Sequence, residues 1–216
     1  MTTGGMPRTF AHGDHVCGLF ESEEEQLTIA VRYIASGLES GDRCLYAAGS
    51  AEALRRFESE LARSGVDVEE AIQAGALLQR TTADTHLAGG RFDCDRMLRY
   101  LNDAVEAALT GGFNGLRACG DMSWLLDQPE GADQVAEYEA MLNHVLDGVR
   151  AAGMCMYDRT RLPHAIIDQA LATHRSVSVN GQHVNNGFYE VDGTAARRTI
   201  AGTLQTGHSE RRPTRA

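Results

Sequence analysis

The sequence predicts an α/β protein in which a mainly parallel sheet is covered by helices on both faces. Apolar runs typical of buried strands alternate with amphipathic stretches typical of helices from about residue 14 to 190. Such alternation favours parallel strands, because a crossover helix has to carry the chain back to the start of the next strand. The 216 residues are 43% hydrophobic and 23% charged, which suits one globular domain with a sizeable core.

Three strands are expected in the first half of the chain, over residues 14–20, 43–48 and 76–81. Ser22 and Glu25 form a capping-box pattern that begins a helix after the first strand, and Gly41 is placed to end it. Ser50 caps a helix after the second strand, and another helix begins at Asp93. Apolar residues follow each cap at helical spacing, which predicts one buried face per helix.

The second half of the chain continues the alternation. Strands are expected over residues 113–119 and 153–157, with one or two more over 176–190. A long helix over 131–152 and a short helix over 163–173 connect them. These strands extend the same sheet, since the pattern shows neither a break nor an internal repeat.

The long helix is assigned its faces from the spacing of its apolar side chains. The side chains expected to face the core are Tyr138, Met141, Leu142, Val145 and Val149. Glu137 and Glu139 are interpreted as part of a solvated face, because charged residues on helices usually remain in water.

The two ends of the chain differ from this body in composition. Residues 1–11 are expected to be a flexible N-terminus, and residues 12–192 to form the domain. The segment 193–216 is expected to be a disordered tail, since the last twenty residues hold five arginines and one acid with few apolar side chains.

Charge and lysine content exclude several function classes. There are 30 acidic and 20 basic side chains, and the formal net charge of −10 argues against nucleic-acid binding by the body and against a membrane surface. All twenty basic residues are arginines, which excludes a phosphate-loop lysine and a Schiff-base lysine. No apolar run approaches the roughly 18 residues that a membrane-spanning helix needs.

The cysteines indicate a reduced protein. They are Cys17, Cys44, Cys94, Cys119 and Cys155. Their odd number, their wide spacing and the lack of a CxxC pair favour free thiols over disulfides or a zinc ribbon. Because the N-terminus also shows no signal peptide, a cytoplasmic location is expected.

The junction between the first strand and the first helix is unsuited to nucleotide binding. A nucleotide-binding α/β protein places a glycine-rich phosphate loop there. Residues 18–25 instead contain one glycine, no lysine and three glutamates in the first turn of the helix. These carboxylates satisfy the positive helix end and repel a phosphate, so nucleotide hydrolysis by the usual route is not expected.

His15 and Cys17 are two residues apart on the first expected strand and therefore project to the same face. An imidazole and a thiolate this close can bind a soft metal, form a reactive ion pair or contact a small polar ligand. The alternative is a buried cysteine beside a hydrogen-bonded histidine. The residues alone leave these readings open.

Other side chains follow the later strands at the edge where open parallel sheets bind ligands. We expect one crevice to bring together His15, Cys17, Asp121, Trp124, Tyr157 and Asp158. Trp124 has a core-anchor alternative, and Asp158 has the alternative of a solvated pair with Arg159. His174 follows a helix and has the alternative of a C-terminal cap.

Five segments in this order resemble the MEDS family, a sensory domain named for methanogens, methylotrophs and the regulator DcmR. The segments are HVCGLFESEEEQ, GLESGDRCLYAAG, GLRACGDMSW, CMYDRTRL and ATHRSVSVNGQHVNNGFYE. The resemblance spans about residues 12–190.

The resemblance implies a three-layer RecA-like fold without a functional phosphate loop, and recognition of small hydrocarbon derivatives. It also implies that the domain acts together with histidine kinases or transcription regulators. No cofactor is expected. The ligand-binding residues that it carries over are His15, Cys17, Phe20, Arg117, Asp121, Trp124, Cys155, Tyr157, Asp158 and His174.

The leading hypothesis is therefore a cytoplasmic ligand-sensing domain that is not an enzyme. Because the sequence contains neither a kinase module nor a helix-turn-helix, its signal would pass to a separate protein, and a homo-oligomer stays open. The alternative is a thiol-dependent or metal-dependent redox sensor or small enzyme built on His15 and Cys17. A third reading is a nucleotide-binding relic.

Overall fold

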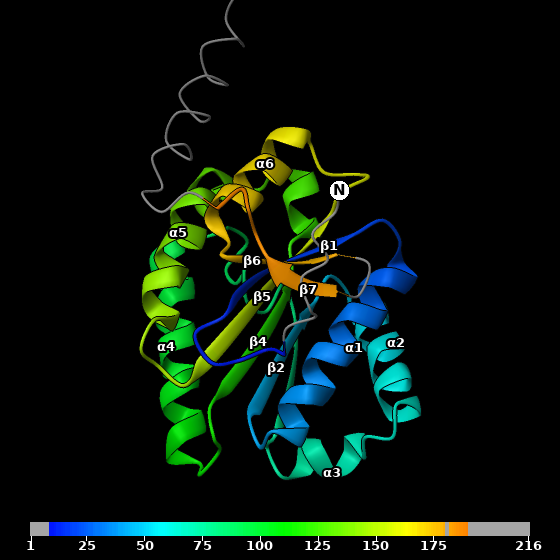
Figure 1. Ribbon diagram of the computed structural model, residues 1–216. Coiled ribbons are helices and arrows are strands. Elements are labelled where there is room, and N and C mark those ends of the chain that lie inside the picture. Colours follow the sequence, from blue (N-terminus) through cyan, green and yellow to red (C-terminus); the bar gives the residue numbers. More distant parts are fainter. Residues whose placement is uncertain (1–8, 180–181, 190–216) are drawn as a thin grey trace, which may run out of the picture.

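The computed structural model describes residues 9–179 and 182–189 (Figure 1). They form a seven-stranded sheet of order β3-β2-β4-β5-β1-β6-β7, in which only the β6–β7 pair is antiparallel. The strands are β1 His15–Phe20, β2 Arg43–Ala48, β3 Leu77–Thr81, β4 Leu116–Asp121, β5 Ala151–Asp158, β6 Ser176–Val179 and β7 Gln182–Asn185. The mainly parallel sheet predicted from the sequence is confirmed.

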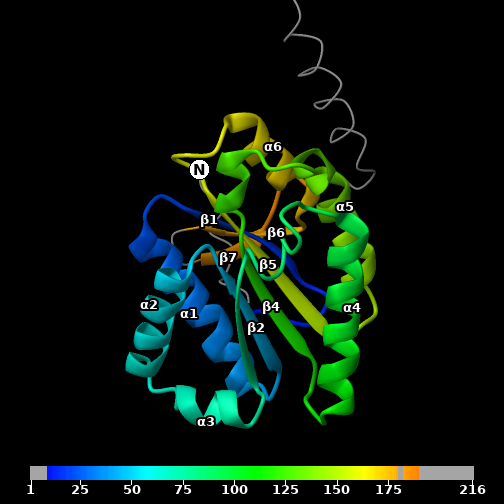
Figure 2. The ribbon, with the colours of Figure 1, turned by 180° about the vertical axis from the view of Figure 1, so that it is seen from behind.

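Three α-helices cover each face of the sheet (Figures 1 and 2). One layer consists of α1 Glu23–Glu39, α2 Ala51–Arg63 and α3 Val68–Gln73, and the other of α4 Cys94–Thr110, α5 Val135–Leu146 and α6 His164–Thr173. The chain crosses the sheet in one direction from β1 to β3 and in the other from β4 to β6. Because parallel crossovers are right-handed, the reversal places the two sets of helices on opposite faces.

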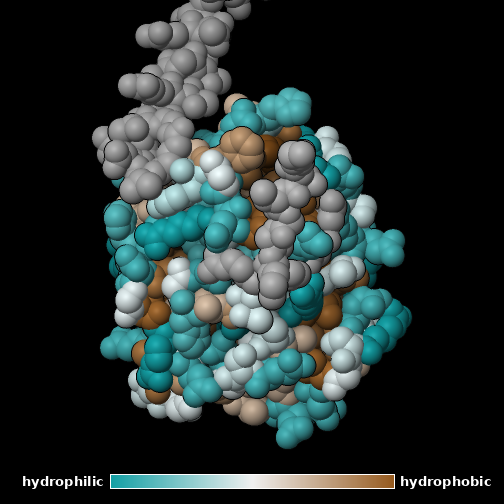
Figure 3. Space-filling model, viewed as in Figure 1, coloured by the Kyte–Doolittle hydropathy of each residue, from teal (hydrophilic) through white to brown (hydrophobic). Residues whose placement is uncertain are grey.

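Side chains of the central strands alternate between two apolar cores. Cys17 and Leu19 of β1 belong to the core beneath α4, α5 and α6, whereas Val16 and Phe20 belong to the core beneath α1 and α2. β5 pairs with β1 so that Cys17 lies opposite Cys155, whose side chain joins the same core. The prediction that His15 and Cys17 share one face is confirmed by this register. The surface seen in Figure 3 is mainly hydrophilic, with hydrophobic residues in small patches.

The predicted helix caps are present. Ser22 accepts a hydrogen bond from the backbone N–H of Glu25, and Ser50 and Asp93 cap α2 and α4 in the same way. Gly41 follows the end of α1 with a φ of +74°, a conformation that favours glycine. The short helix α3, which the sequence analysis did not include, is capped by Asp67.

The helix expected over residues 131–152 is much shorter in the structure. α5 ends at Leu146, Gly148 turns the chain with a φ of +78°, and β5 begins at Ala151. Met141 and Val149, both expected to face the core, are 39% and 38% exposed. The glycine turn ends the helix before Val149, so this residue was wrongly included in the apolar face, whereas Met141 belongs to α5 but lies on its exposed side.

The chain ends lie mostly outside the described residues, including the expected tail 193–216. Phe10 falls within the expected flexible N-terminus, yet its ring packs 4.8 Å from that of Tyr33 and 4.7 Å from that of His183. Among the described helices, none is long and apolar enough to cross a membrane.

Candidate functional site

The six residues expected to share one crevice do not meet, and the ten predicted ligand-binding residues lie in several places. Five lie between the sheet and the helices α5 and α6: His15, Cys17, Cys155, Tyr157 and His174. Phe20, Asp121 and Asp158 line a cleft at the carboxyl ends of the strands. Arg117 and Trp124 lie elsewhere. The expectation of a single crevice is wrong because His15 and Cys17 point sideways from β1 into the helix layer, not along the strand towards its end.

The strand-end cleft has a volume of about 720 Å³ and is lined by residues that follow β1, β2, β4 and β5. Its acidic lining residues are Glu23, Glu24, Glu52, Asp121 and Asp158, against Arg56 and Arg161. Arg56 forms ion pairs with Glu23 and Glu52, so part of the positive charge is already neutralised. The remaining negative charge disfavours a phosphate-bearing ligand, in agreement with the glutamate-rich junction.

Arg117 lies near the amino end of β4, away from the cleft. Its guanidinium donates hydrogen bonds to Asp42 Oδ2 at 3.2 and 3.1 Å, and both residues are almost fully buried. The other oxygen of Asp42 lies 2.8 Å from His12 Nε2. Arg117 thus joins β4 to the start of β2, and its position does not bring it to a ligand in the cleft.

Trp124 follows β4 on the 3-10 turn η1 Ser123–Asp127 and is 5% exposed. Its ring stacks on that of Phe92 at 5.1 Å and lies 5.8 Å from that of His86. The core-anchor alternative therefore describes the placement of Trp124.

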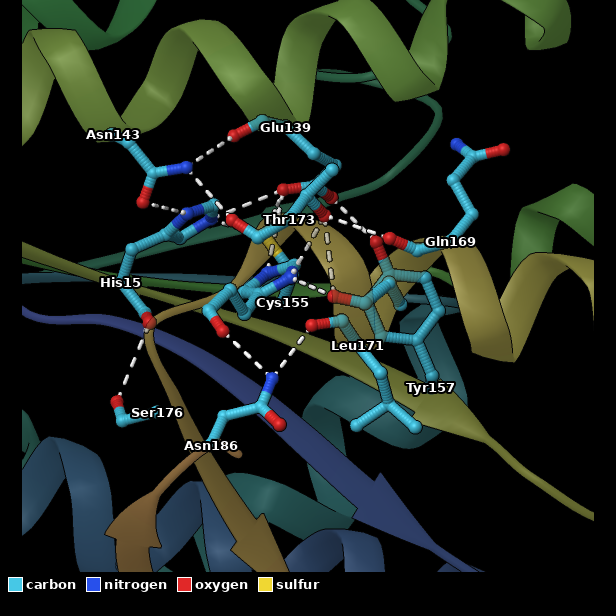
Figure 4. Close-up of polar contacts among 12 residues, drawn as sticks. His15, Glu139, Asn143, Cys155, Tyr157, Gln169, Leu171, Thr173, Ser176 and Asn186 are labelled. Atoms are coloured by element: carbon cyan, nitrogen blue, oxygen red, sulfur yellow. Dashed lines mark hydrogen bonds and ion pairs between the residues drawn. The ribbon is translucent and has the colours of Figure 1, made fainter. Parts of the chain in front are cut away.

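A buried tetrad lies between β1, β5, α5 and α6 (Figure 4) and consists of His15, Glu139, Cys155 and His174. The nitrogen, oxygen and sulfur atoms that these residues offer all lie within 4.8 Å of one another. Glu139 Oε2 is central, at 3.0 Å from His15 Nε2, 3.4 Å from His174 Nε2 and 3.4 Å from Cys155 Sγ. The tetrad is shielded from water, since none of its members is more than 5% exposed.

Surrounding hydrogen bonds orient Glu139 and His15. Tyr157 donates its hydroxyl proton to Glu139 Oε1 at 2.5 Å, which leaves Oε2 for the other members of the tetrad. The Asn143 amide donates from Nδ2 to the carbonyls of Glu139 and Thr173 at 3.2 and 2.7 Å. Its Oδ1 therefore accepts from His15 Nδ1 at 3.3 Å, and Nε2 of His15 faces Glu139.

His174 is held in a similar way at the C-terminal end of α6. Its Nδ1 donates to the carbonyl of Ala170 at 2.7 Å, so the predicted C-cap is present. Because Nδ1 carries this proton, Nε2 of the neutral ring is an acceptor aimed at Glu139 Oε2. Nε2 is buried and has no hydrogen-bond partner among the described residues.

Burial and charge set the protonation states in the tetrad. Burial alone raises the pKa of Glu139, but His174 and hydrogen bonds from His15 and Tyr157 outweigh it and lower the pKa to about 2. Burial, assisted by His15, lowers the pKa of His174 to about 3. Burial and then Glu139 raise the pKa of Cys155 well above its usual value. At neutral pH the tetrad therefore holds a carboxylate, a thiol and a neutral His174.

Sequence reasoning missed Glu139, which it assigned to a solvated face. Glu139 lies one turn after Val135 and one turn before Leu142 and Asn143, and all four are buried. This spacing was present in the sequence, but the charge of Glu139 was taken to keep it in water, whereas buried hydrogen-bond partners hold the carboxylate in the interior.

An apolar cavity of about 40 Å³ adjoins the tetrad, between β2, β4 and β5 and the helices α4 and α5. Cys155 contributes to both. His86 is a polar residue of the cavity wall, and its Nδ1 donates to Thr85 Oγ1 at 3.1 Å, because the Thr85 hydroxyl proton goes to the carbonyl of Thr81. Burial lowers the pKa of His86 to about 4, so its Nε2 is an uncharged acceptor.

Comparison with known proteins identifies the family. The MEDS family, described as MEthanogen/methylotroph, DcmR Sensory domain, matches residues 14–175. The chain belongs to the MEDS family. The resemblance found in the sequence is thereby confirmed, and with it the coarse assignment of this MEDS domain to a sensory role. No curated protein matches the chain.

Two solved structures are similar to this MEDS domain in fold. The KaiC-like protein PH0186 from Pyrococcus horikoshii OT3 is 19% identical with a TM-score of 0.53, over 77% of this chain and 70% of that one. The flagellar accessory protein FlaH from Methanocaldococcus jannaschii is 14% identical with a TM-score of 0.54, over 84% and 77%. The three-layer fold is RecA-like, as predicted.

Proposed function

We propose that this MEDS domain senses a small hydrocarbon derivative that binds in the apolar cavity beneath α4 and α5. The binding is non-enzymatic, and the signal passes to a separate histidine kinase or transcription regulator in the cytoplasm. The observation that carries the proposal is the cavity itself. Protein interiors contain few voids larger than a water molecule, and a void of 40 Å³ costs about 1 kcal/mol.

The size of the cavity limits the ligand to very small molecules. An engineered apolar cavity of about 150 Å³ accommodates benzene, which has six heavy atoms. By proportion, a cavity of 40 Å³ holds roughly one or two heavy atoms. Two atoms at the ceiling of about 1.5 kcal/mol each give a dissociation constant of about 6 mM, so the sensor would respond to abundant one-carbon compounds.

The cavity wall also suggests which functional group the ligand carries. Leu101, Val105 and Leu142 supply apolar contacts, and His86 Nε2 supplies an acceptor. A short alkyl group with one N–H or O–H fits this combination, since the donor satisfies His86 while the carbon atoms fill the void.

The non-enzymatic reading is supported by the forms of the nearest reactive groups, because His86 is neutral and Cys155 is a protonated thiol. The alternative of a redox sensor built on His15 and Cys17 has less support. Burial and then Glu139 raise the pKa of the Cys17 thiol, and the sulfur near His15 Nε2 is that of Cys155, at 3.8 Å. An ion pair between Cys17 and His15 is therefore not favoured.

Trp124 fluorescence tests the proposal, since its ring lies next to His86 at the cavity wall. We expect saturable changes with methanol and methylamine in the millimolar range. Ala118→Val fills the cavity and should weaken binding at least tenfold, whereas Val105→Ala enlarges the cavity and should favour longer ligands. Equal binding by wild type and both variants would contradict the cavity as the site.

A further inference from the structure

The four ligand atoms of the buried tetrad all lie within 4.8 Å of one another, close enough to surround one metal ion. Zinc binds nitrogen and oxygen at about 2.0–2.2 Å and sulfur at about 2.3 Å, so tetrahedral ligands lie roughly 3.3–3.8 Å apart. Glu139 Oε2 lies 3.4 Å from both His174 Nε2 and Cys155 Sγ, and the sulfur lies 3.8 Å from His15 Nε2, all within this range. Glu139 Oε2 and His15 Nε2 are closer, at 3.0 Å. The ligand atoms come from β1, α5, β5 and the C-cap of α6.

Two of these ligand atoms, His174 Nε2 and Glu139 Oε2, are both hydrogen-bond acceptors and face each other with no hydrogen atom between them. The Nδ1 proton of His174 is committed to Ala170, so its Nε2 presents a lone pair to the Glu139 carboxylate at 3.4 Å. Nε2 has no hydrogen-bond partner among the described residues and is fully buried. Two acceptors in contact are unfavourable away from water, and a cation between them removes the conflict.

The outer hydrogen bonds are those that metal-binding histidines and carboxylates usually have. Each imidazole donates its Nδ1 proton to an oxygen, that of Asn143 for His15 and that of Ala170 for His174. Tyr157 holds the second oxygen of Glu139. Such partners fix the tautomer and the orientation of the ligands before the metal arrives.

From this geometry we propose that His15 Nε2, His174 Nε2, Cys155 Sγ and Glu139 Oε2 bind one divalent transition-metal ion of the zinc class. Two imidazoles, one thiolate and one carboxylate suit Zn²⁺ or Co²⁺, whereas Mg²⁺ and Ca²⁺ prefer oxygen ligands alone. The metal and the proposed organic ligand occupy different positions, the tetrad and the cavity, although Cys155 borders both.

Charge balances when the metal enters. The ion displaces the thiol proton of Cys155, which passes to the solvent, and takes the lone pairs of the two Nε2 atoms. Its two positive charges are balanced by the carboxylate of Glu139 and the thiolate of Cys155, so the loaded site is neutral. Affinity should therefore rise with pH, since each ion bound releases the thiol proton.

Cobalt titration of the metal-free chain tests the site, because Co²⁺ bound to a thiolate gives a sulfur-to-cobalt charge-transfer band. We expect one Co²⁺ per chain, and displacement of the colour by Zn²⁺. Cys155→Ser should abolish the band and weaken binding at least tenfold. The matched control is Cys17→Ser, which removes a buried thiol from the same face of the sheet and should retain the band.

A second variant covers the case in which Cys155→Ser does not fold. Tyr157→Phe removes only the hydroxyl that orients Glu139, and it should weaken cobalt binding about 10-fold to 100-fold while keeping the band. Absence of cobalt binding by wild type, or an unchanged spectrum in Cys155→Ser, would overturn the proposal. The Trp124 titration, run with chelator and again with Zn²⁺, shows separately whether the cavity binds its ligand.

Discussion

The strand-end cleft and the buried tetrad contain the same kinds of charged side chain in opposite environments. In the cleft, the side chains of Glu23 and Glu52 are 80% and 65% exposed, and their ion pairs with Arg56 are surrounded by water. In the tetrad, the Glu139 side chain is 1% exposed and contacts His15, His174, Cys155 and Tyr157. Solvent screens the first set of charges, whereas the second depends on the positions of individual atoms.

This difference indicates where specificity can reside in this MEDS domain. RecA-like folds offer a cleft at the ends of the strands, and here that cleft has acquired carboxylates that disfavour phosphate. The oriented donors and the apolar cavity lie inside the helix layer. Any ligand of that interior must be small, because the helices α4, α5 and α6 cover it.

The largest expected difference between the two regions is in stability. Glu139→Ala, studied with chelator present, should lower the free energy of unfolding by about 3–5 kcal/mol, because it leaves His15, His174 and Tyr157 without their buried partner. Glu23→Ala in the cleft should leave the urea midpoint almost unchanged. Equal effects of the two variants in urea unfolding would remove the distinction between the regions.

The pH dependence of stability should come from the interior and not from the cleft. The pKa of His174 is lowered from 6.5 to about 3 and that of Glu139 from 4.5 to about 2, so both groups stabilise the fold above their unfolded pKa values. That stability is lost as pH falls, between about 6.5 and 3 for His174 and between about 4.5 and 2 for Glu139.

His174→Gln isolates the first of these contributions. Urea unfolding at a series of pH values gives the slope of the unfolding free energy against pH, which counts the protons taken up on unfolding. Between pH 6.5 and 3, this slope should correspond to up to one proton fewer in the variant than in wild type. His144→Gln, on the exposed side of α5, is the matched control and should keep the wild-type slope. A slope that changes equally in both variants would contradict the assignment to the tetrad.

The smallest expected effect concerns nucleotides in the cleft. Purified protein with ATP or GTP and Mg²⁺ should give no turnover, because Glu23 and Glu24 line the cleft at the start of α1 and the chain contains no lysine. Asp121→Asn should leave this baseline unchanged. Steady phosphate release that Asp121→Asn abolishes would show that the cleft is a working nucleotide site.

Much of the fold could be predicted because its signals are local. Apolar runs marked the strands, and Ser22, Ser50 and Asp93 marked helix starts that the structure confirms. The end of α5 was misplaced because Gly148 turns the chain after Leu146, whereas apolar residues continue at Val149 and from Ala151 on. The site was predicted only in part. The alternation of side chains along a strand placed His15 and Cys17 on one face of the sheet, but no feature of the sequence near His15 indicated its contact with Glu139.

The sequence by itself therefore determined the α/β class, the unsuitability of the first junction for phosphate and the shared face of His15 and Cys17. Tertiary structure alone decided that β1 lies between β5 and β6. This order brings Cys155 and His174 to His15, and it places Glu139 of α5 above them. The physical reason is that capping and side-chain period act within a few residues, whereas strand order results from packing the whole chain.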